Sequence, residues 1–454
     1  MVTALVMLNV DRKHIRNVSQ SLVDMKEVSE VYSVAGRYDL VAIVRVQSNE
    51  QIADTITVKF SALEGITATE TLIAFHTFSR HDLEHMFSIG SKTDSMNSKI
   101  GDLKIRQAIL DMDAYLPPLE SRDPEKHLLM DFNESPVPPQ EKVIQAVSDF
   151  LSRRAHVYPA YHDFLKILSD YTGVAENQLI LSNGSDQGIE FILRCFLESG
   201  DELVMTQPGF AMFQQVASSL GAKVAGPGFP ESMEFPAEAF KQSVGPATRL
   251  LVLINPNNPT GTSISQEVIR DVLENFPNLP VLVDEAYFEF SRQTAAGLLD
   301  AFPNLIILRT FSKALALPSL RLGYVMAHPE LIQQFSKIRG PFDVNAAAVV
   351  AAKVQLENPQ EWRSLTRHLM DEVKPTVETF FRENQVRFHP SSANFMLVEV
   401  KDAKGAVDYL KSKGILVRLM HPPLENSFRM SLRRMPEMEQ FMSIFKAFLD
   451  KRTG

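Results

Sequence analysis

The sequence has 454 residues, 45% hydrophobic and 22% charged, with a formal net charge of −9. This length exceeds the roughly 250 to 300 residues of one core, so we expect two or three domains. The acidic balance and the lack of long Lys/Arg runs argue against nucleic acid or membrane as partner. The single cysteine, Cys195, excludes an intramolecular disulfide and favours a reducing, cytoplasmic location. No apolar run approaches the roughly 20 residues of a membrane helix.

Residues 1–80 follow the order strand, helix, strand, strand, helix, strand. The run Val2–Val10 is apolar, and Ile15, Val18 and Leu22 recur at helical spacing after it. This order predicts a ferredoxin-like α+β sheet. Residues 81–104 contain a polar Gly/Ser stretch without periodicity, which predicts a linker.

Within this first region, the segments Val34–Leu40 and Glu64–Thr71 resemble the effector-binding domain of the Lrp/AsnC regulators. In that family the domain dimerises through its sheet and binds amino acids between protomers. The resemblance therefore implies either a domain that senses an amino-acid effector or a domain that only dimerises. The chain begins directly at the first strand, without the winged helix of that family, so DNA binding is not expected.

From about residue 105 onward, apolar strand-like runs alternate with longer helical segments. The clearest strands are predicted at Leu203–Met205, Arg249–Ile254, Val281–Val283 and Leu305–Leu308. This alternation predicts α/β layering around a largely parallel sheet. Because ligands bind beyond the carboxyl ends of such strands, polar residues after these runs are the candidates for a site.

The strand at Leu305–Leu308 is followed by Thr310-Phe311-Ser312-Lys313, and Arg321 comes eight positions after the lysine. A lysine amine can hold a carbonyl cofactor as a Schiff base. The neighbouring hydroxyls and the guanidinium can bind an anion. The combination suggests pyridoxal phosphate.

Four more segments lie at predicted strand ends or helix starts. Asn255–Gly261 is a turn that its prolines and glycine make rigid. Asp284 ends a buried strand, where a carboxylate needs a cation such as a protonated pyridine nitrogen or an arginine. Ser182–Asp186 precedes a helix predicted at Ile189–Phe196. This segment either exposes backbone N–H groups to a phosphate, or Ser185 or Asp186 is a plain N-cap of the helix. Phe210 could stack on a flat cofactor or belong to the core.

Together these segments resemble the fold-type I aminotransferases, and most closely the histidinol-phosphate aminotransferases. The segments that carry the resemblance are Asn133–Pro136, Val157–Pro159, Asn183–Asp186, Asn255–Gly261, Asp284–Tyr287, Thr310–Lys313 with Arg321, and Phe428–Met430. The resemblance spans residues 105–454. It implies a mainly parallel seven-stranded sheet in a large domain at about 140–345, and a smaller α/β domain from about 105–139 and 346–454.

The resemblance also implies roles for the residues around the cofactor. Lys313 would form the Schiff base and carry the proton of transamination, and Asp284 would keep the pyridine nitrogen protonated. Asn258 and Tyr287 would donate hydrogen bonds to the phenolic oxygen of the cofactor. The phosphate would be held by Gly184, Ser185, Asp186, Thr310, Ser312 and Arg321. Phe210 would stack on the ring in place of the family's tyrosine.

Further residues are implied to meet the substrate or the partner subunit. Arg429 would bind the substrate carboxylate, Arg418 would lie near the substrate side chain, and Asn133 would contact the substrate. Tyr158 would reach the cofactor phosphate of the other subunit. A homodimer or higher homo-oligomer follows. No metal is expected.

The function that these expectations describe is transfer of an amino group between an amino donor and a 2-oxo acid. The donor would be histidinol phosphate or an aromatic or neutral amino acid. Gln187 stands where the family usually has glutamate, so the resemblance does not decide the donor. Two alternatives stay open: a pyridoxal-phosphate-dependent decarboxylase of an O-phospho amino acid, and a non-catalytic regulator that senses the cofactor or an amino acid.

Overall fold

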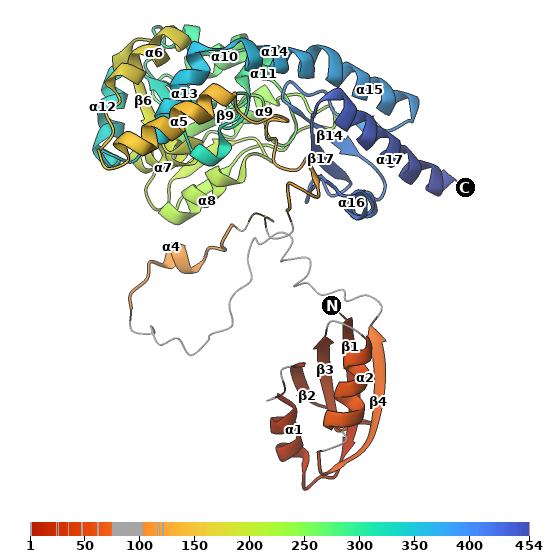
Figure 1. Cartoon of the computed structure of the whole chain (residues 1–454). Coiled ribbons are helices and arrows are strands. Elements are labelled where there is room, and N and C mark those ends of the chain that lie inside the picture. The colour runs from red at the N-terminus through yellow and green to blue at the C-terminus, as the bar shows by residue number, and fades with distance from the viewer. Residues whose placement is uncertain are drawn as a thin grey trace. The chain divides into compact units, whose positions relative to one another are not determined.

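The computed structural model describes residues 2–74, apart from 24, 26, 35, 47, 48, 61 and 62, and residues 103–453, apart from 116, 118, 120 and 121. Residues 81–102 of the predicted linker lie outside the described residues. The chain forms two compact units; among the described residues, one contains 2–74 and 113–115, and the other contains 103–112 and 117–453 (Figure 1). The predicted domain boundaries themselves remain a prediction.

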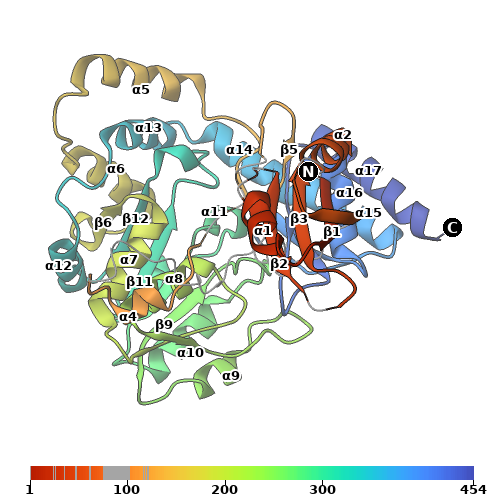
Figure 2. The same ribbon diagram turned by 90° about the horizontal axis from the view of Figure 1, so that it is seen from below.

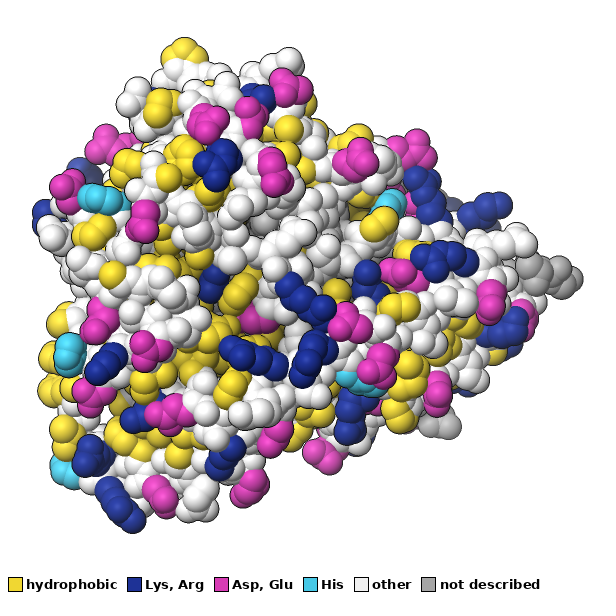
Figure 3. All heavy atoms as spheres, turned by 90° about the horizontal axis from the view of Figure 1, so that it is seen from above, with side chains coloured by type: hydrophobic (Ala, Val, Ile, Leu, Met, Phe, Trp, Pro, Cys, Tyr) yellow, Lys and Arg dark blue, Asp and Glu magenta, His cyan; other side chains and the backbone are white. Residues whose placement is uncertain are grey.

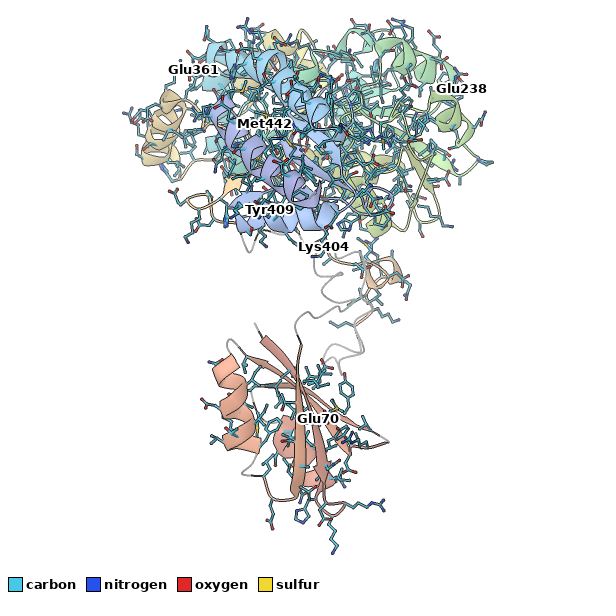
Figure 4. The ribbon with its side chains drawn as sticks, turned by 90° about the vertical axis from the view of Figure 1, so that its right-hand side faces the viewer. Glu70, Glu238, Glu361, Lys404, Tyr409 and Met442 are labelled. Atoms are coloured by element: carbon cyan, nitrogen blue, oxygen red, sulfur yellow. The ribbon has the colours of Figure 1, made fainter. Side chains whose placement is uncertain are left out.

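The N-terminal unit is a four-stranded antiparallel sheet in the order β2-β3-β1-β4. Its elements are β1 (Val2–Val10), α1 (Ile15–Val23), β2 (Val28–Ser33), β3 (Leu40–Val46), α2 (Asn49–Asp54), a π-helical turn (Thr55–Phe60) and β4 (Ile66–Ala74). Val6 and Leu8 of β1 pack with Val18 of α1 and Ile52 of α2 in one core, so both helices cover the same face of the sheet. Glu70 of β4 accepts a hydrogen bond from Tyr38 (Figure 4). The predicted ferredoxin-like arrangement is confirmed.

The large unit contains a seven-stranded sheet in the order β6-β12-β11-β10-β9-β7-β8, with β12 antiparallel to both of its neighbours. The strands are β6 (Leu179–Ser182), β7 (Glu202–Met205), β8 (Lys223–Ala225), β9 (Thr248–Ile254), β10 (Val281–Asp284), β11 (Leu305–Thr310) and β12 (Gly323–Ala327). Each residue of β10 and β11 is buried, as expected for a sheet covered on both faces. The predicted mainly parallel sheet is confirmed.

Side chains of the central strands alternate between two hydrophobic cores. Leu282 and Ile306 point into one core, which α7 (Gly184–Phe196), α8 (Ala211–Leu220) and α12 (Pro329–Ile338) cover. Val283 and Ile307 point into the other core. The helices on that side include α5 (Glu141–Arg154), α6 (His162–Thr172), α10 (Gln266–Asn275), α13 (Ala346–Glu357) and α14 (Gln360–His368). Helices α5, α6 and α13 lie side by side at one end of the sheet (Figure 2).

A smaller antiparallel sheet in the order β13-β14-β17-β16 forms the C-terminal part of this unit. Its strands are β13 (Arg387–Phe388), β14 (Phe395–Glu399), β16 (Arg418–Leu419) and β17 (Ser427–Ser431), and its helices are α15 (Lys374–Glu383), α16 (Ala403–Ser412) and α17 (Met435–Thr453). Tyr409 of α16 packs its ring 5.5 Å from that of Phe448 in α17 (Figure 4). A second small pair joins β5 (Leu128–Leu129) to β15 (Ile415–Leu416).

The remaining helical elements are short. They are α4 (Gln107–Leu110), α9 (Ala237–Gln242), α11 (Phe288–Ser291), the 3-10 turns Glu176–Gln178, Ala296–Leu298 and Pro318–Leu320, and the π-helical turn Leu369–Val373. Within the predicted range 105–139, β5 joins the smaller domain, whereas α4 packs on α8 of the large sheet. No helix among the described residues is long and apolar enough to cross a membrane.

One helix boundary differs from the prediction. Helix α7 begins at Gly184, five residues before the predicted start at Ile189, and its N-cap position is Asn183. Gly184 has a φ of 74°, which glycine adopts without strain and which lets the helix start directly after β6. Ser185 and Asp186 therefore lie inside the first helical turn, where backbone N–H groups have no partner within the helix. Neither of them is the N-cap.

Candidate active site

The predicted site residues gather at one edge of the large sheet. Strands β6, β9, β10 and β11 run in the same direction, so their carboxyl ends meet there. The residues at or just after these ends are Gly184, Ser185, Asp186, Asn258, Asp284, Tyr287, Thr310, Ser312 and Lys313. On the face of the large unit in Figure 3, hydrophobic side chains line a hollow that several Lys and Arg side chains border.

Lys313 lies three residues beyond the end of β11 and is held by the segment around Asn133. Its Nζ donates to the carbonyl oxygen of Phe132 at 2.9 Å and lies 5.7 Å from the centre of the Tyr287 ring. Asn133 is buried, and its Nδ2 donates to the Tyr287 hydroxyl at 2.9 Å. The lysine, the tyrosine and Asn133 therefore form one cluster.

Asp284 is a buried carboxylate with little to stabilise its charge. Burial raises its pKa to about 7, and the charges of Asp186 and Glu285 add to the rise, whereas the Ala286 amide and Lys313 lower it. The Ala286 N–H donates to Oδ1 at 3.1 Å. No ion pair reaches this carboxylate from any residue in the described part of the chain. A cation placed beside it would be strongly favoured.

The turn after β9 presents Asn258 to an arginine of the smaller sheet. Asn255 fixes the turn, because its side chain accepts from the Ile264 N–H at 2.8 Å and donates to the Ile264 carbonyl at 2.9 Å. The Oδ1 of Asn258 accepts a short hydrogen bond from Nη1 of Arg429. Nη2 of Arg429 donates to the Asp131 carbonyl oxygen at 2.6 Å. The Asn258 amide group is thereby left with its two N–H donors to offer a ligand.

Arg418 and Arg429 are directly opposite each other on β16 and β17. Opposed residues on an antiparallel pair point to the same face, and like charges there repel. Nη1 of Arg418 is buried without a hydrogen-bond partner, and its Cζ lies 5.6 Å from the Phe132 ring centre. Burial, helped by the Arg418 charge, lowers the pKa of nearby His421 to about 4. The two arginines form a site suited to an anion.

A second anion site lies at the start of α7. Arg321 donates from Nη2 to the Asp186 carboxylate at 2.9 Å, and a side chain at Gly184 would collide with this guanidinium. The hydroxyls of Thr310 and Ser312, both buried, lie 3.0 Å apart at the end of β11. Free helix N–H groups, two hydroxyls and a guanidinium are groups that bind phosphate.

Two predicted residues lie apart from these hydrogen-bonded clusters. Phe210 is the N-cap of α8 and packs partly buried against the core that α7 and α8 cover. Tyr158 is 77% exposed, and its ring stacks on that of Phe342 at 4.4 Å. Asp131 and Phe132 were not predicted as site residues, because they act through backbone carbonyls that no side-chain pattern reveals.

Comparisons with known proteins place this site in a family. Residues 125–445 match the family "Aminotransferase class I and II", and residues 3–83 match "Lrp/AsnC ligand binding domain". A histidinol-phosphate aminotransferase of Dehalococcoides mccartyi is 34% identical over 336 residues, which cover 72% of this chain and 93% of the relative. A dihydroxyacetone phosphate transaminase of Campylobacter jejuni is 30% identical over 336 residues, with 72% and 91% covered.

The fold is also that of a solved aminotransferase. The histidinol-phosphate aminotransferase of Sinorhizobium meliloti, solved with pyridoxal-5′-phosphate, aligns with a TM-score of 0.69 at 24% identity, covering 76% of this chain and 98% of that one. The donor set here fits that cofactor, because a lysine, a buried carboxylate without an ion pair and a phosphate cradle share one sheet edge. The chain therefore belongs to the class I and II aminotransferases and is a transaminase whose cofactor is pyridoxal 5′-phosphate.

Proposed function

We propose that this transaminase uses an amino donor that carries a phosphate, of which histidinol phosphate is the leading example, and a 2-oxo acid as acceptor. The observation that carries the proposal is the pair of opposed arginines, Arg418 and Arg429. Their mutual repulsion is relieved by an anionic group: the phosphate of the donor can accept from both guanidinium groups at once, and the carboxylate of the 2-oxo acid can accept from Arg429. The two relatives at 34% and 30% identity carry names with phosphorylated substrates.

Lys313 would provide the proton transfers. When bound, pyridoxal phosphate supplies an aldehyde that condenses with amines and a ring that accepts electron density. The Nζ of Lys313 would take the proton from the substrate Cα and return it during the exchange. Its present acceptor, the Phe132 carbonyl, holds the amine at the site beside the Tyr287 ring.

The other residues would orient the cofactor. Asp284 would pair with the protonated ring nitrogen, which removes the cost of its buried charge. Asn258 would offer an N–H to the phenolic oxygen, since its Oδ1 is taken by Arg429. Tyr287 would donate its hydroxyl hydrogen to the same oxygen, because its oxygen already accepts from Asn133.

The cofactor phosphate would lie at the first turn of α7, where Gly184, Ser185 and Asp186 supply N–H groups. Thr310 and Ser312 would add hydroxyls, and Arg321 would add charge. Asp186 keeps the Arg321 guanidinium beside this turn. Phe210, the N-cap of α8, would stack on the ring, and it lacks the hydroxyl that a tyrosine would bring.

A homodimer would complete the site. Ile144 and Leu151 of α5, with Val157, Tyr158 and Phe342, expose large apolar side chains. Such a cluster favours burial against another protein surface, and two-fold assemblies are the commonest. In a dimer with this interface, Tyr158 would be available to the phosphate of the partner's site.

The N-terminal unit would bind an amino-acid effector, which its match to the Lrp/AsnC ligand binding domain supports. The alternative is a domain that only dimerises. A variant without residues 1–80 should keep transaminase activity and lose inhibition or activation by free amino acids. Unchanged feedback in this truncated protein would leave dimerisation as its role.

A screen of amino donors would test the substrate proposal. The absorbance of the enzyme-bound cofactor should change fastest with histidinol phosphate, and Arg418→Ala should reduce this preference over phenylalanine. A faster reaction with aromatic or neutral amino acids would contradict the phosphate proposal. Release of CO2 without need for a 2-oxo acid would instead identify a decarboxylase.

Full transamination by Lys313→Ala would refute the assignment of Lys313 as the proton carrier. Binding of the cofactor and an amino acid without turnover in the wild type would favour a non-catalytic regulator.

A further inference from the structure

Gln187 uses both halves of its amide to hold the turn that starts α7. Its Oε1 accepts from the Asn183 N–H at 2.6 Å, at the N-cap of the helix. Its Nε2 donates to Oδ2 of Asp343 at 2.9 Å, 156 residues away in the chain. A glutamate could make the first of these bonds, but an ionised glutamate has no hydrogen to donate in the second.

Asp343 is in turn tied to the strand that leads into α7. It forms an ion pair with Arg339 at 2.8 Å, in which the side chains are 10% and 11% exposed. Nη1 of Arg339 donates to the Leu181 carbonyl oxygen in β6 at 2.5 Å. The contacts from Leu181 through Arg339, Asp343 and Gln187 to Asn183 therefore brace the turn between β6 and α7 on both of its flanks.

The same segment also holds the second phosphate-site turn. Nδ2 of Asn345 donates to the Leu320 carbonyl oxygen at 2.8 Å, next to Arg321. Asn345 itself is fixed as the N-cap of α13, because its Oδ1 accepts from the Ala348 N–H at 2.8 Å. Residues 339–345 therefore connect the first turn of α7 with the turn that carries Arg321.

We infer that Gln187 and Asp343 are matched positioning residues for the phosphate-binding turn, and that the amide at position 187 is required because Asp343 is a carboxylate. A glutamate at 187 would face that carboxylate at hydrogen-bond distance in a partly buried place, where like charges repel. The turn would shift, and its N–H groups would lose their alignment with Arg321. The inference rests on the proposed function, in which this turn and Arg321 bind the cofactor phosphate.

The test measures how cofactor-free enzyme takes up pyridoxal phosphate. Gln187→Glu should raise the apparent dissociation constant for pyridoxal phosphate by about tenfold, which is the effect expected from one lost charge-assisted hydrogen bond. Adding Asp343→Asn should restore most of this affinity, because an asparagine can donate to the new glutamate. The loss should appear in the apparent KM for pyridoxal phosphate rather than in kcat at saturation.

Gln107→Glu is the matched control. Gln107 donates to Asp111 at 2.7 Å on the exposed surface of α4, so the substitution breaks the same kind of bond outside this turn and outside the proposed dimer interface. Cofactor affinity in this variant should equal that of the wild type. Gln187→Glu with wild-type affinity, or an unrescued double variant, would overturn the inference. So would a loss of kcat at saturating cofactor together with a lower melting temperature of the cofactor-free protein.

Competition by inorganic phosphate separates this inference from the proposed function. In the wild type, inorganic phosphate should compete with pyridoxal phosphate, and Arg321→Ala should weaken that competition. Absence of competition in the wild type would overturn the phosphate-site assignment and the inference with it. Intact competition with no effect of Gln187→Glu would overturn the inference alone.

Discussion

Two buried carboxylates that are neighbours in the sequence lie in opposite surroundings. Glu285 is fully buried, forms an ion pair with Arg309 at 2.8 Å and accepts from Thr294 at 2.8 Å and from the Ala295 N–H at 2.6 Å. Asp284 is nearly as buried, but within the part of the chain that the structure describes only the Ala286 N–H donates to it. The first carboxylate has its charge compensated within the chain, whereas the second has a pKa raised to about 7.

This difference indicates that the buried charge of Glu285 serves the structure, whereas the buried charge of Asp284 serves the function. On the Glu285 side, the Arg309 guanidinium also lies 3.5 Å from the Phe288 ring centre and donates to Thr294 at 2.6 Å. Such a satisfied network stabilises the fold and leaves nothing for a ligand. On the Asp284 side, a cation is needed, and the cofactor's ring nitrogen supplies it in the proposed function. Substitutions at the two positions should therefore affect different properties.

The largest effect is expected at Asp284. Asp284→Asn should lower kcat by about a thousandfold, because an amide cannot stabilise the positive charge on the cofactor ring. The cofactor-free variant should unfold at the same or higher denaturant concentration, since a poorly compensated buried carboxylate is removed. Steady-state kinetics and urea unfolding measure the two properties. Wild-type kcat in this variant would contradict the assignment of Asp284.

The opposite result is expected at Glu285. Glu285→Gln should lower the free energy of unfolding by about 3 kcal/mol, because it leaves the buried Arg309 charge uncompensated. Activity of the folded fraction should fall far less than in Asp284→Asn. Glu231→Gln is the control, because Glu231 pairs with Arg387 at 3.0 Å at the exposed surface. Such surface pairs contribute little, so its stability should match the wild type.

The pH dependence of stability provides a third distinction. The folded-state pKa of Asp284 is about 7, above its ordinary value of 3.8, so the folded state binds more protons between these limits. Its contribution to stability is fully present below pH 4 and is lost as the pH rises towards 7, by at most about 1.4 kcal/mol per pH unit. The stability of the cofactor-free wild type minus that of Asp284→Asn should therefore decrease between pH 5 and 7. A difference that stays constant would contradict the raised pKa.

Much of this site could be predicted because polar side chains directly after apolar strand runs are visible in the sequence. Asp284, Asn258 and Lys313 follow buried apolar runs, and the carboxyl ends of parallel strands meet at one edge. The order of elements in residues 2–74 was likewise enough for the ferredoxin-like sheet. These features depend on local sequence and on the few topologies that connections allow.

Other contacts could not be predicted because they depend on distant or backbone groups. The Phe132 carbonyl that accepts from Lys313 is a group every residue has, and the two residues are 181 positions apart. The bond between Gln187 and Asp343 joins segments without a shared motif. The start of α7 was predicted too late because Gly184, a poor helix former, is its first residue.

The smallest effect is expected from the loss of the Tyr324 hydroxyl in β12. Tyr324 is buried, and its hydroxyl accepts from Nη1 of Arg309 at 3.3 Å. Tyr324→Phe should lower the free energy of unfolding by about 1 kcal/mol, the usual value of one hydrogen bond, because Arg309 keeps Glu285 and Thr294 as partners. Its kcat should stay that of the wild type.

The same substitution at Tyr287 is the matched comparison, because that buried hydroxyl accepts from Asn133 on the cofactor side. Tyr287→Phe should lower kcat, since the phenolic oxygen of the cofactor would lose a donor. Urea unfolding and steady-state kinetics on both variants decide the matter. A loss of kcat in Tyr324→Phe with none in Tyr287→Phe would contradict this assignment. The Glu285–Arg309 network, rather than the cofactor side of the sheet, would then control the chemistry.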